Sequence, residues 1–231
     1  MADWPVVPAP VDPHSEDRLF FDDHEWDTIE AATARIIPTD HDPGAREARA
    51  VRFIDRYLSG IGYVYAAADG SGFLQMSGRL ADAWRARIAD LGETYRQGVL
   101  DLDTIARERF GANFVSLRES DQDAVLEQLS GASKPAPVGL TGEHGNPTIQ
   151  VYAFDDGLTF FDALVAHTRQ GFYGDPVYGG NRHQVGWTVI GFPGPESLRD
   201  TMDGTYSVRE YYVQDYDWRD LIPHLRGAGR S

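Results

Sequence analysis

Two residues that could take part in chemistry, Arg182 and His183, are adjacent in a segment that carries very little charge. The segment runs from Gly171 to Gly194 and reads GFYGDPVYGGNRHQVGWTVIGFPG. A histidine can act as a general acid or base when a partner orients its ring, and an arginine in apolar surroundings pairs with a carboxylate or with carbonyls. No spacing in the chain identifies an orienting partner for His183. An enzyme with a site around Arg182 and His183 is therefore one open interpretation.

A binding role is the interpretation that the rest of this segment favours. It holds seven glycines and five aromatic residues but only two formal charges, Asp175 and Arg182. Gly, Pro and Asn predict a long loop, and low charge with aromatic anchors and one arginine is typical of the core of a protein interface. We predict that residues 171–194 form a docking loop whose partner interface consists of Phe172, Tyr173, Tyr178, Gly179, Gly180, Asn181, Arg182 and Trp187. The rival interpretation is an internal plug, with Trp187 packed under the first helix against Trp26.

Other candidate groups are weaker. His24 lies at a predicted helix start and His167 on a predicted helix, without a partner at a recognisable spacing. The sequence Asp40, His41, Asp42, with Glu47 nearby, offers oxygens of the kind that calcium binds, but a solvated turn explains it better. We therefore predict no catalytic and no metal-binding residue on this chain.

The missing motifs exclude several functions. No G-x-G-x-x-G follows a strand-like run and no G-x-x-x-x-G-K-[ST] occurs, so the usual phosphate-binding loops for nucleotide or flavin are absent. The chain has no cysteine, which excludes disulfides, covalent c-type haem and cysteine-ligated iron–sulfur clusters. We expect no cofactor on this chain.

Charge and hydropathy limit the partners. A formal charge of −15 over 231 residues disfavours nucleic acid, because phosphates would be repelled. No apolar run reaches the length of a membrane span, so we expect no direct membrane insertion. The N-terminus has neither a secretory nor a twin-arginine signal, and the expected location from the sequence is the cytoplasm.

The elements that must position the loop are helices. Apolar residues recur at helical spacing in six stretches, and the sequence predicts a mainly α, irregular helical domain with at least five helices, long Gly/aromatic loops and little or no β structure. Asp22 or Asp23 caps the first helix, Pro38 stops it, and Ser120 with Asp123 forms a capping box for the fifth. The predicted helices are 23–37, 45–58, 74–96, 103–110, 121–129 and 158–169.

The domain organisation follows from composition. Residues 1–18 contain four prolines and predict an extended Pro-rich arm. Residues 19–231 predict a single domain, with an exposed loop at 130–148. For the aromatic tail at 196–231 the sequence leaves strand and helix open.

Three blocks of the chain resemble the gluconate 2-dehydrogenase subunit 3 family, the small or gamma subunits of FAD-dependent sugar dehydrogenases. The blocks are FFDDHEWDTIEAATARIIPTD, PGAREARAVRFIDRYL and the loop GFYGDPVYGGNRHQVGWTVIGFPG. They follow the family's order and span residues 20–58 and 171–194. Residues 59–157 match by helical character alone.

The resemblance implies a non-catalytic partner that stabilises a large flavoprotein of the glucose–methanol–choline class. That large subunit would hold FAD and oxidise a sugar or sugar acid, and a cytochrome c or another acceptor in the complex would take the electrons. Family members often carry a twin-arginine signal, which this chain lacks, so a periplasmic or membrane-associated location through the partner is the alternative to the cytoplasm. A carbohydrate-binding module remains a third function class, because Trp and Tyr stack on sugar rings.

Overall fold

The computed structural model describes residues 6–7, 17–67, 73–131, 158–192 and 194. Most of this part of the chain is helical, and its two strands have only two residues each. The predicted mainly α class is therefore confirmed. The helices are α1 (Asp23–Ile36), α2 (Ala50–Ser59), α3 (Gly78–Phe110), α4 (Glu119–Ser130), α5 (Phe160–Tyr173) and α6 (Val185–Val189). Short 3₁₀ turns are η1 (Ile61–Tyr63), η2 (Phe114–Ser116), η4 (Pro176–Tyr178) and η5 (Arg182–Gln184).

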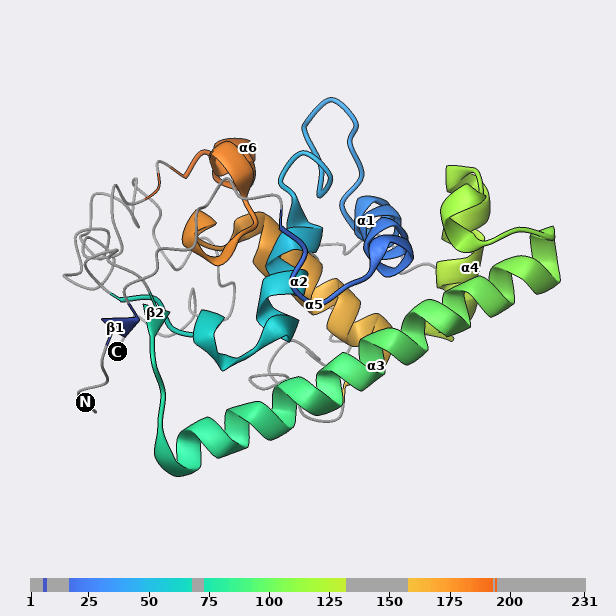
Figure 1. The fold of residues 1–231 in the computed structure, drawn as a ribbon. Coiled ribbons are helices and arrows are strands. Elements are labelled where there is room, and N and C mark those ends of the chain that lie inside the picture. The colour runs from blue at the N-terminus through green and yellow to red at the C-terminus, as the bar shows by residue number, and fades with distance from the viewer. Residues whose placement is uncertain (1–5, 8–16, 68–72, 132–157, 193, 195–231) are drawn as a thin grey trace, which may run out of the picture.

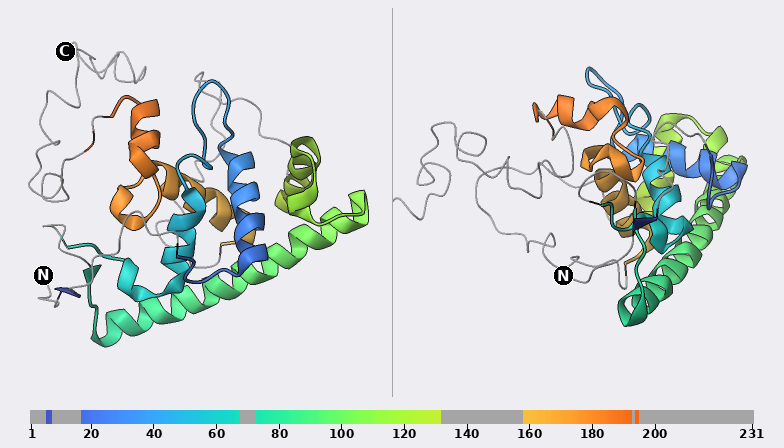
Figure 2. Two further views of the ribbon diagram at one scale, coloured as in Figure 1. Left: turned by 45° about the horizontal axis from the view of Figure 1, so that its top comes forward. Right: turned by 60° about the vertical axis from the view of Figure 1, so that its left-hand side comes forward.

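The long helix α3 forms one side of the molecule, and the other helices pack on it. Figure 1 shows α3 running beneath α1, α2 and α5, with α4 near its C-terminal end and α6 beyond the end of α5. Figure 2 shows the same arrangement from two further sides. The most extensive packing joins α2 to α5. The segment that follows α5, which carries the predicted docking loop, is therefore held by α2 and α5 together.

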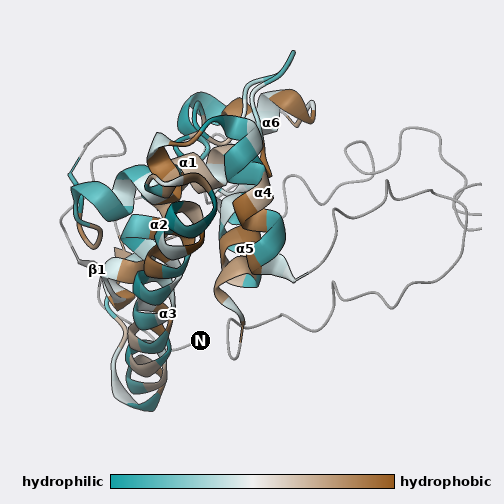
Figure 3. Cartoon of the chain, turned by 90° about the vertical axis from the view of Figure 1, so that its right-hand side faces the viewer, coloured by the Kyte–Doolittle hydropathy of each residue, from teal (hydrophilic) through white to brown (hydrophobic). Residues whose placement is uncertain are grey.

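The core lies where α1, α2, α3 and α5 meet. Most of its members come from the apolar stripes of these helices, as expected for amphipathic helices around one core, and η2 and α4 add Phe114 and Val125. Figure 3 shows that α5 carries broad hydrophobic stretches, whereas hydrophilic and hydrophobic segments alternate along α3. The residues with no exposed surface include Ile29, Ile54, Tyr95, Leu102, Phe114, Val125, Ala163 and Leu164.

Helix α1 begins and ends as predicted. The Asp22 carboxylate accepts the Glu25 backbone N–H (2.8 Å), and the Glu25 carboxylate accepts the Asp22 backbone N–H (3.0 Å). This reciprocal capping box satisfies two amides that a helix N-terminus leaves without intrahelical partners. The helix stops two residues before Pro38, which cannot continue it.

Helix α2 begins at Ala50 rather than at the predicted residue 45. Arg49 adopts a left-handed conformation with φ 55°, and a residue in that conformation cannot belong to a right-handed helix. Arg49 pairs with Glu30 on α1 at 3.3 Å. The apolar spacing alone did not reveal this interruption.

A buried carboxylate on α2 holds the chain that enters α1. Asp55 has no exposed surface and accepts the backbone N–H groups of Leu19 (2.7 Å), Phe20 (2.9 Å) and Phe21 (2.9 Å). A buried polar group needs such partners to offset its desolvation. Asp55 therefore acts as the anchor of this segment, a role that the sequence did not indicate.

Helix α3 is one helix of 33 residues, and the prediction of two helices, at 74–96 and 103–110, was wrong. The predicted gap contains Gly98, a residue that weakens helices by about 1 kcal/mol relative to alanine. A Cβ at Gly98 would overlap the ring of Phe160 on α5. The glycine therefore permits close helix packing, and it does not end the helix.

Helix α4 begins at Glu119, and the predicted capping box of Ser120 and Asp123 does not form. The Asp123 carboxylate instead accepts two hydrogen bonds from the Arg35 guanidinium on α1, at 2.8 and 3.0 Å. Charge-assisted bidentate pairs of this kind are stronger than a neutral cap. This ion pair, together with Glu119, holds the pKa of Arg35 above its usual value.

The chain around the helices is only partly described. Strands β1 (Val6–Val7) and β2 (Phe73–Leu74) pair antiparallel, so part of the predicted Pro-rich arm joins a short ribbon. The rest of the arm up to residue 16, residues 132–157, which include most of the predicted loop at 130–148, and the tail from 195 onward lie outside the described residues. The domain boundaries at 18 and 19 therefore stay predictions. In the described part, no helix combines the length and the apolar character that crossing a bilayer requires.

Candidate functional site

The predicted docking loop is a compact set of short turns. Helix α5 runs four residues past its predicted end and stops at Tyr173, so Gly171 and Phe172 are helical. The chain then forms η4, η5 and α6 in immediate succession. Asp175 is the N-cap of η4, and its carboxylate accepts the Val177 backbone N–H at 2.9 Å. The segment is thus better described as a folded substructure than as an extended loop.

Asn181 closes this substructure. Its backbone N–H donates to the Gly171 carbonyl (2.6 Å), and its side-chain amide donates to the Gly174 carbonyl (2.8 Å). Its side-chain oxygen accepts the Gly186 backbone N–H at 2.8 Å. The residue has no exposed surface and a φ of 46°, a conformation that asparagine tolerates better than most residues. Asn181 therefore joins the end of α5, the turn after it and the start of α6 in one clasp.

Two glycines allow the clasp to close. A Cβ at Gly180 would overlap the Gly171 carbonyl, and a Cβ at Gly186 would overlap the Phe172 carbonyl. Gly179 has a φ of 106° and lies against the buried side chain of Arg56 on α2. Close backbone approach and positive φ are the two situations that favour glycine. Backbone geometry thus explains the consecutive residues Gly179, Gly180 and Asn181 of the loop.

The aromatic residues of the loop divide between interior and surface. Phe172 is 1% exposed and Trp187 6%, whereas Tyr173 is 41% exposed. The Trp187 indole N–H donates to the Tyr173 carbonyl at 2.7 Å, and its ring packs edge-to-face with Phe192 at 5.3 Å. These contacts place Trp187 within the loop itself rather than against Trp26, which packs under Arg18.

Tyr178 and Arg182 are half-buried. The Tyr178 hydroxyl accepts the Ala66 backbone N–H at 3.3 Å, and burial raises the pKa of Tyr178. The Arg182 backbone N–H donates to the Ala48 carbonyl at 3.0 Å. The eight predicted interface residues therefore form one structural unit, with Phe172, Gly179, Gly180, Asn181 and Trp187 inside it. That all eight contact a partner stays a prediction.

His183 and His167 have different surroundings. His183 is exposed, with a φ of 56°. His167 has no exposed surface, lies 2.8 Å from the Tyr95 hydroxyl through Nδ1 and stacks on the Tyr95 ring at 5.7 Å. A core position explains His167 without chemistry, because Nδ1 has a buried hydrogen-bond partner and the ring packs among aromatic side chains.

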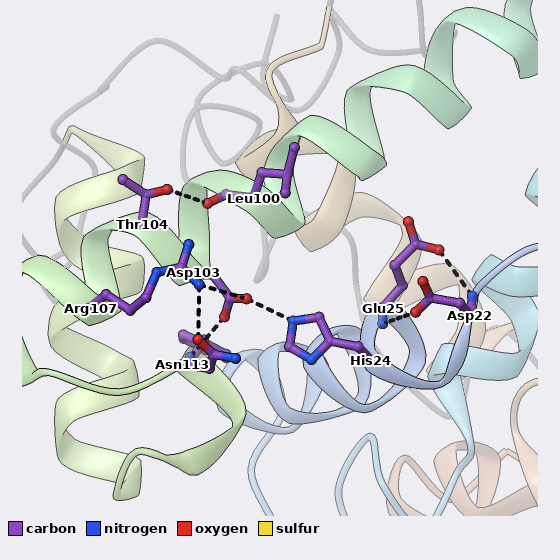
Figure 4. A network of polar contacts seen from close by, with 9 residues as sticks. Asp22, His24, Glu25, Leu100, Asp103, Thr104, Arg107 and Asn113 are labelled. Atoms are coloured by element: carbon purple, nitrogen blue, oxygen red, sulfur yellow. Dashed lines mark hydrogen bonds and ion pairs between the residues drawn. The ribbon is translucent and has the colours of Figure 1, made fainter.

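His24 has the orienting carboxylate that spacing could not reveal. Its Nε2 lies 2.7 Å from Oδ2 of Asp103, a residue on α3 that is 79 positions away in sequence. Figure 4 shows this contact together with Arg107 and Asn113. Asp103 is buried, and its other oxygen accepts the Phe114 backbone N–H at 2.9 Å. The pair therefore connects α1, α3 and η2, and a structural role accounts for all of these contacts.

The acidic turn at Asp40, His41 and Asp42 is fully at the surface, and its three potential ligand atoms lie within 4.8 Å of one another. His41 contacts both carboxylates, at 3.2 and 3.1 Å. The Asp42 backbone N–H donates to the Asp40 carboxylate, which lowers the pKa of Asp40. The Glu47 carboxylate accepts hydrogen bonds from Thr39 and Gly44. The contacts are those of a solvated turn.

A groove of about 340 Å³ opens between α3 and η1. Its floor is apolar and includes Phe20, Leu58 and Ile61, while Arg85, Asp90, Glu93 and Arg96 form its charged rim. The Arg96 guanidinium lies over the Phe20 ring at 4.6 Å. Sequence reasoning did not find this groove, because its walls come from separate elements.

One comparison with known proteins gave a match. The family model described as Gluconate 2-dehydrogenase subunit 3 matches residues 23–194. The match begins at the first residue of α1 and ends at Gly194, the last residue of the predicted docking loop. Neither the curated proteins nor the solved structures contain a match to this chain.

Proposed function

The chain belongs to the gluconate 2-dehydrogenase subunit 3 family, and we propose that it is the non-catalytic small subunit of an FAD-dependent dehydrogenase. In this proposal a large flavoprotein of the glucose–methanol–choline class holds FAD and oxidises a sugar or sugar acid. The present chain binds that subunit and stabilises its folded state. A cytochrome c or another electron acceptor joins through the complex.

The observation that supports a docking role is the pre-formed shape of the clasp around Asn181. Three hydrogen bonds of 2.6–2.8 Å fix the backbone between Gly171 and Gly186. A surface that is rigid before binding loses less conformational entropy in the complex. Of the predicted interface residues, Tyr173, Tyr178 and Arg182 retain exposed surface. We propose that these three contact the partner directly, while the buried five maintain the loop.

The test is co-expression with the large flavoprotein, which we expect the neighbouring reading frame to encode. A tag on this chain should retain the flavoprotein at a defined stoichiometry, and the complex should carry FAD and oxidise a sugar with an artificial electron acceptor. The isolated chain should show neither a flavin nor a haem absorption band and no turnover. Stoichiometric flavin on the isolated chain, or sugar oxidation by it, would contradict the proposal.

A carbohydrate-binding function predicts a different result from the same material. Calorimetric titration of the isolated chain with glucose and gluconate should give no heat of binding if the chain only docks. Saturable binding to the isolated chain would favour the carbohydrate-binding alternative.

A further inference from the structure

The apolar stripe of α3 extends beyond the core that it helps to form. Leu80, Trp84, Ile88, Leu91 and Tyr95 recur at three- and four-residue spacing, which places them on one face of the helix. Ile88, Leu91 and Tyr95 are 6%, 4% and 0% exposed, so this part of the stripe lies in the core. Leu80 is 46% exposed and Trp84 is half-buried. The same face therefore changes from interior to surface within two helical turns.

The first turns of α3 project from the bundle. Between Gly78 and Arg87 only Ala81 is buried. Figure 1 and both views of Figure 2 show this end of α3 reaching past the bundle of α1, α2 and α5. Surface apolar residues that continue a helix stripe differ from scattered ones, because they form a contiguous patch that can bind a partner.

Neighbouring side chains hold Trp84 in place. Tyr65 meets its ring edge-to-face at 5.9 Å, and Tyr57 does so at 6.3 Å. The Arg87 guanidinium lies over the indole at 4.7 Å from the ring centroid. Tyr65 is itself 37% exposed. Trp, Tyr and Arg are the residues in which interface binding energy concentrates, and an anchor with a fixed conformation loses little entropy on binding.

The charge around this stripe has the opposite sign to that of the whole chain. Residues 78–88 contain three arginines and one aspartate, in a chain with a formal charge of −15. Given 3.6 residues per turn, Arg85 and Arg87 lie on opposite sides of the stripe. Arg85 pairs with Asp82 on the same helix at 2.8 Å. Arg85 also forms part of the rim of the groove between α3 and η1. A complementary surface therefore needs an apolar centre and an acidic border.

We propose that the N-terminal part of α3, residues 78–88 with Tyr65, is a second docking surface, and that it inserts into an acid-rimmed apolar groove of the large dehydrogenase subunit. This proposal rests on the proposed function. The binding mode is that of an amphipathic helix in a groove, with anchors one turn apart. Leu80 and Trp84 are the anchors, and Arg87 pairs with the acidic rim.

The test compares two leucines on the same helix in the full chain, each bound to the purified large subunit. Leu80→Asp places a carboxylate on the stripe, opposite the acidic rim. Leu100→Asp makes the same change at a leucine that is 57% exposed and whose neighbours Gln97, Asp101 and Thr104 are polar. We expect Leu80→Asp to raise Kd at least about 30-fold, the hot-spot range, and Leu100→Asp to change it less than about 3-fold.

Charge reversal and salt provide an independent measurement. Arg87→Glu should weaken binding and reduce its dependence on ionic strength, because rim charges act through screened attraction. The melting temperature of the isolated chain should be the same for Leu80→Asp and Leu100→Asp, since both side chains reach the surface.

The outcomes separate this proposal from the proposed function. If the unmodified chain does not bind the large subunit, the proposed function fails. If it binds and Leu80→Asp binds equally well, the function stands and the second docking surface is refuted. A fall in melting temperature with Leu80→Asp alone would mean that the chain covers its own stripe, and would overturn the proposal. The proposal would also be overturned if the isolated chain self-associated and Leu80→Asp abolished that self-association while leaving binding to the large subunit unchanged.

Discussion

Replacing Asn181 with alanine tests whether the clasp stabilises this chain from within. The substitution removes the side-chain donor to the Gly174 carbonyl and the acceptor for the Gly186 N–H, both at 2.8 Å. Gly186 is buried, and a buried amide without a partner costs about 1–3 kcal/mol. The half-buried Gly174 carbonyl adds about 1 kcal/mol because water can partly replace the donor. Alanine at a φ of 46° adds about 1 kcal/mol.

The expected loss in the free energy of unfolding is therefore about 3–5 kcal/mol. For a chain of this size, 1 kcal/mol corresponds to about 2–4 °C, so the melting temperature should fall by about 6–20 °C. Circular dichroism at 222 nm, or scanning calorimetry, measures this on the full chain. Asn181→Gly separates the two causes, since glycine accepts the positive φ but makes neither hydrogen bond, and it should recover about 1 kcal/mol.

Asn113→Ala is the matched control, because its side chain accepts one hydrogen bond from Arg107 at the surface. Surface changes of this kind usually stay within about 0.5 kcal/mol. If Asn181→Ala melts within about 2 °C of the unmodified chain, the internal role assigned to the clasp is refuted. If it also weakens partner binding at an unchanged melting temperature, Asn181 acts at the interface, as the sequence predicted.

Three further predictions test the packing and the charges. Gly180→Ala should destabilise the chain by about 1–3 kcal/mol because its Cβ meets a backbone carbonyl, whereas Gly62→Ala, with nothing within 4 Å of a new Cβ, should be nearly neutral in a thermal melt. Asp55→Ala leaves three amides of residues 19–21 without their acceptor, and should speed hydrogen exchange of those amides; unchanged exchange would exclude the anchor role. Burial raises the pKa of Asp175, so its ionisation opposes folding once the pH exceeds the ordinary carboxyl value of about 3.9. Asp175→Asn should therefore stabilise the chain at pH 7 and lose this advantage on acidification towards pH 3, as urea unfolding at both pH values would show; an advantage that is larger at low pH would contradict the sign.

Local rules in the sequence predicted most of the helices. The capping box at Asp22 and the stop before Pro38 operate within one turn of the chain, so they appear in sequence and structure alike. The predicted division of α3 was wrong, and the predicted gap contains Gly98, whose contact with the Phe160 ring appears only in the tertiary structure. A glycine that admits a ring from another helix cannot be distinguished, by its own position, from one that ends a helix.

In the loop at 171–194, too, the sequence could not show which residues are buried. Its composition identified the segment as unusual, but interior and surface positions are mixed within it. Phe172 and Tyr173 are neighbours in sequence, yet one is 1% and the other 41% exposed. The sequence also did not show that part of the α3 stripe is exposed. Leu80 and Trp84 follow the same helical spacing as the buried Ile88, so spacing cannot distinguish the exposed residues from the buried one.

The sequence by itself determined the helical class, the family and the location of the distinctive loop, because periodicity, capping and motif order are local properties of the chain. Only the tertiary structure decided which of these residues are covered. It brought Asn181 to three backbone partners, Asp103 to His24 and Asp55 to the amides before α1. Burial and hydrogen bonding depend on residues that are distant in sequence, and their positions follow from the packing of the whole core.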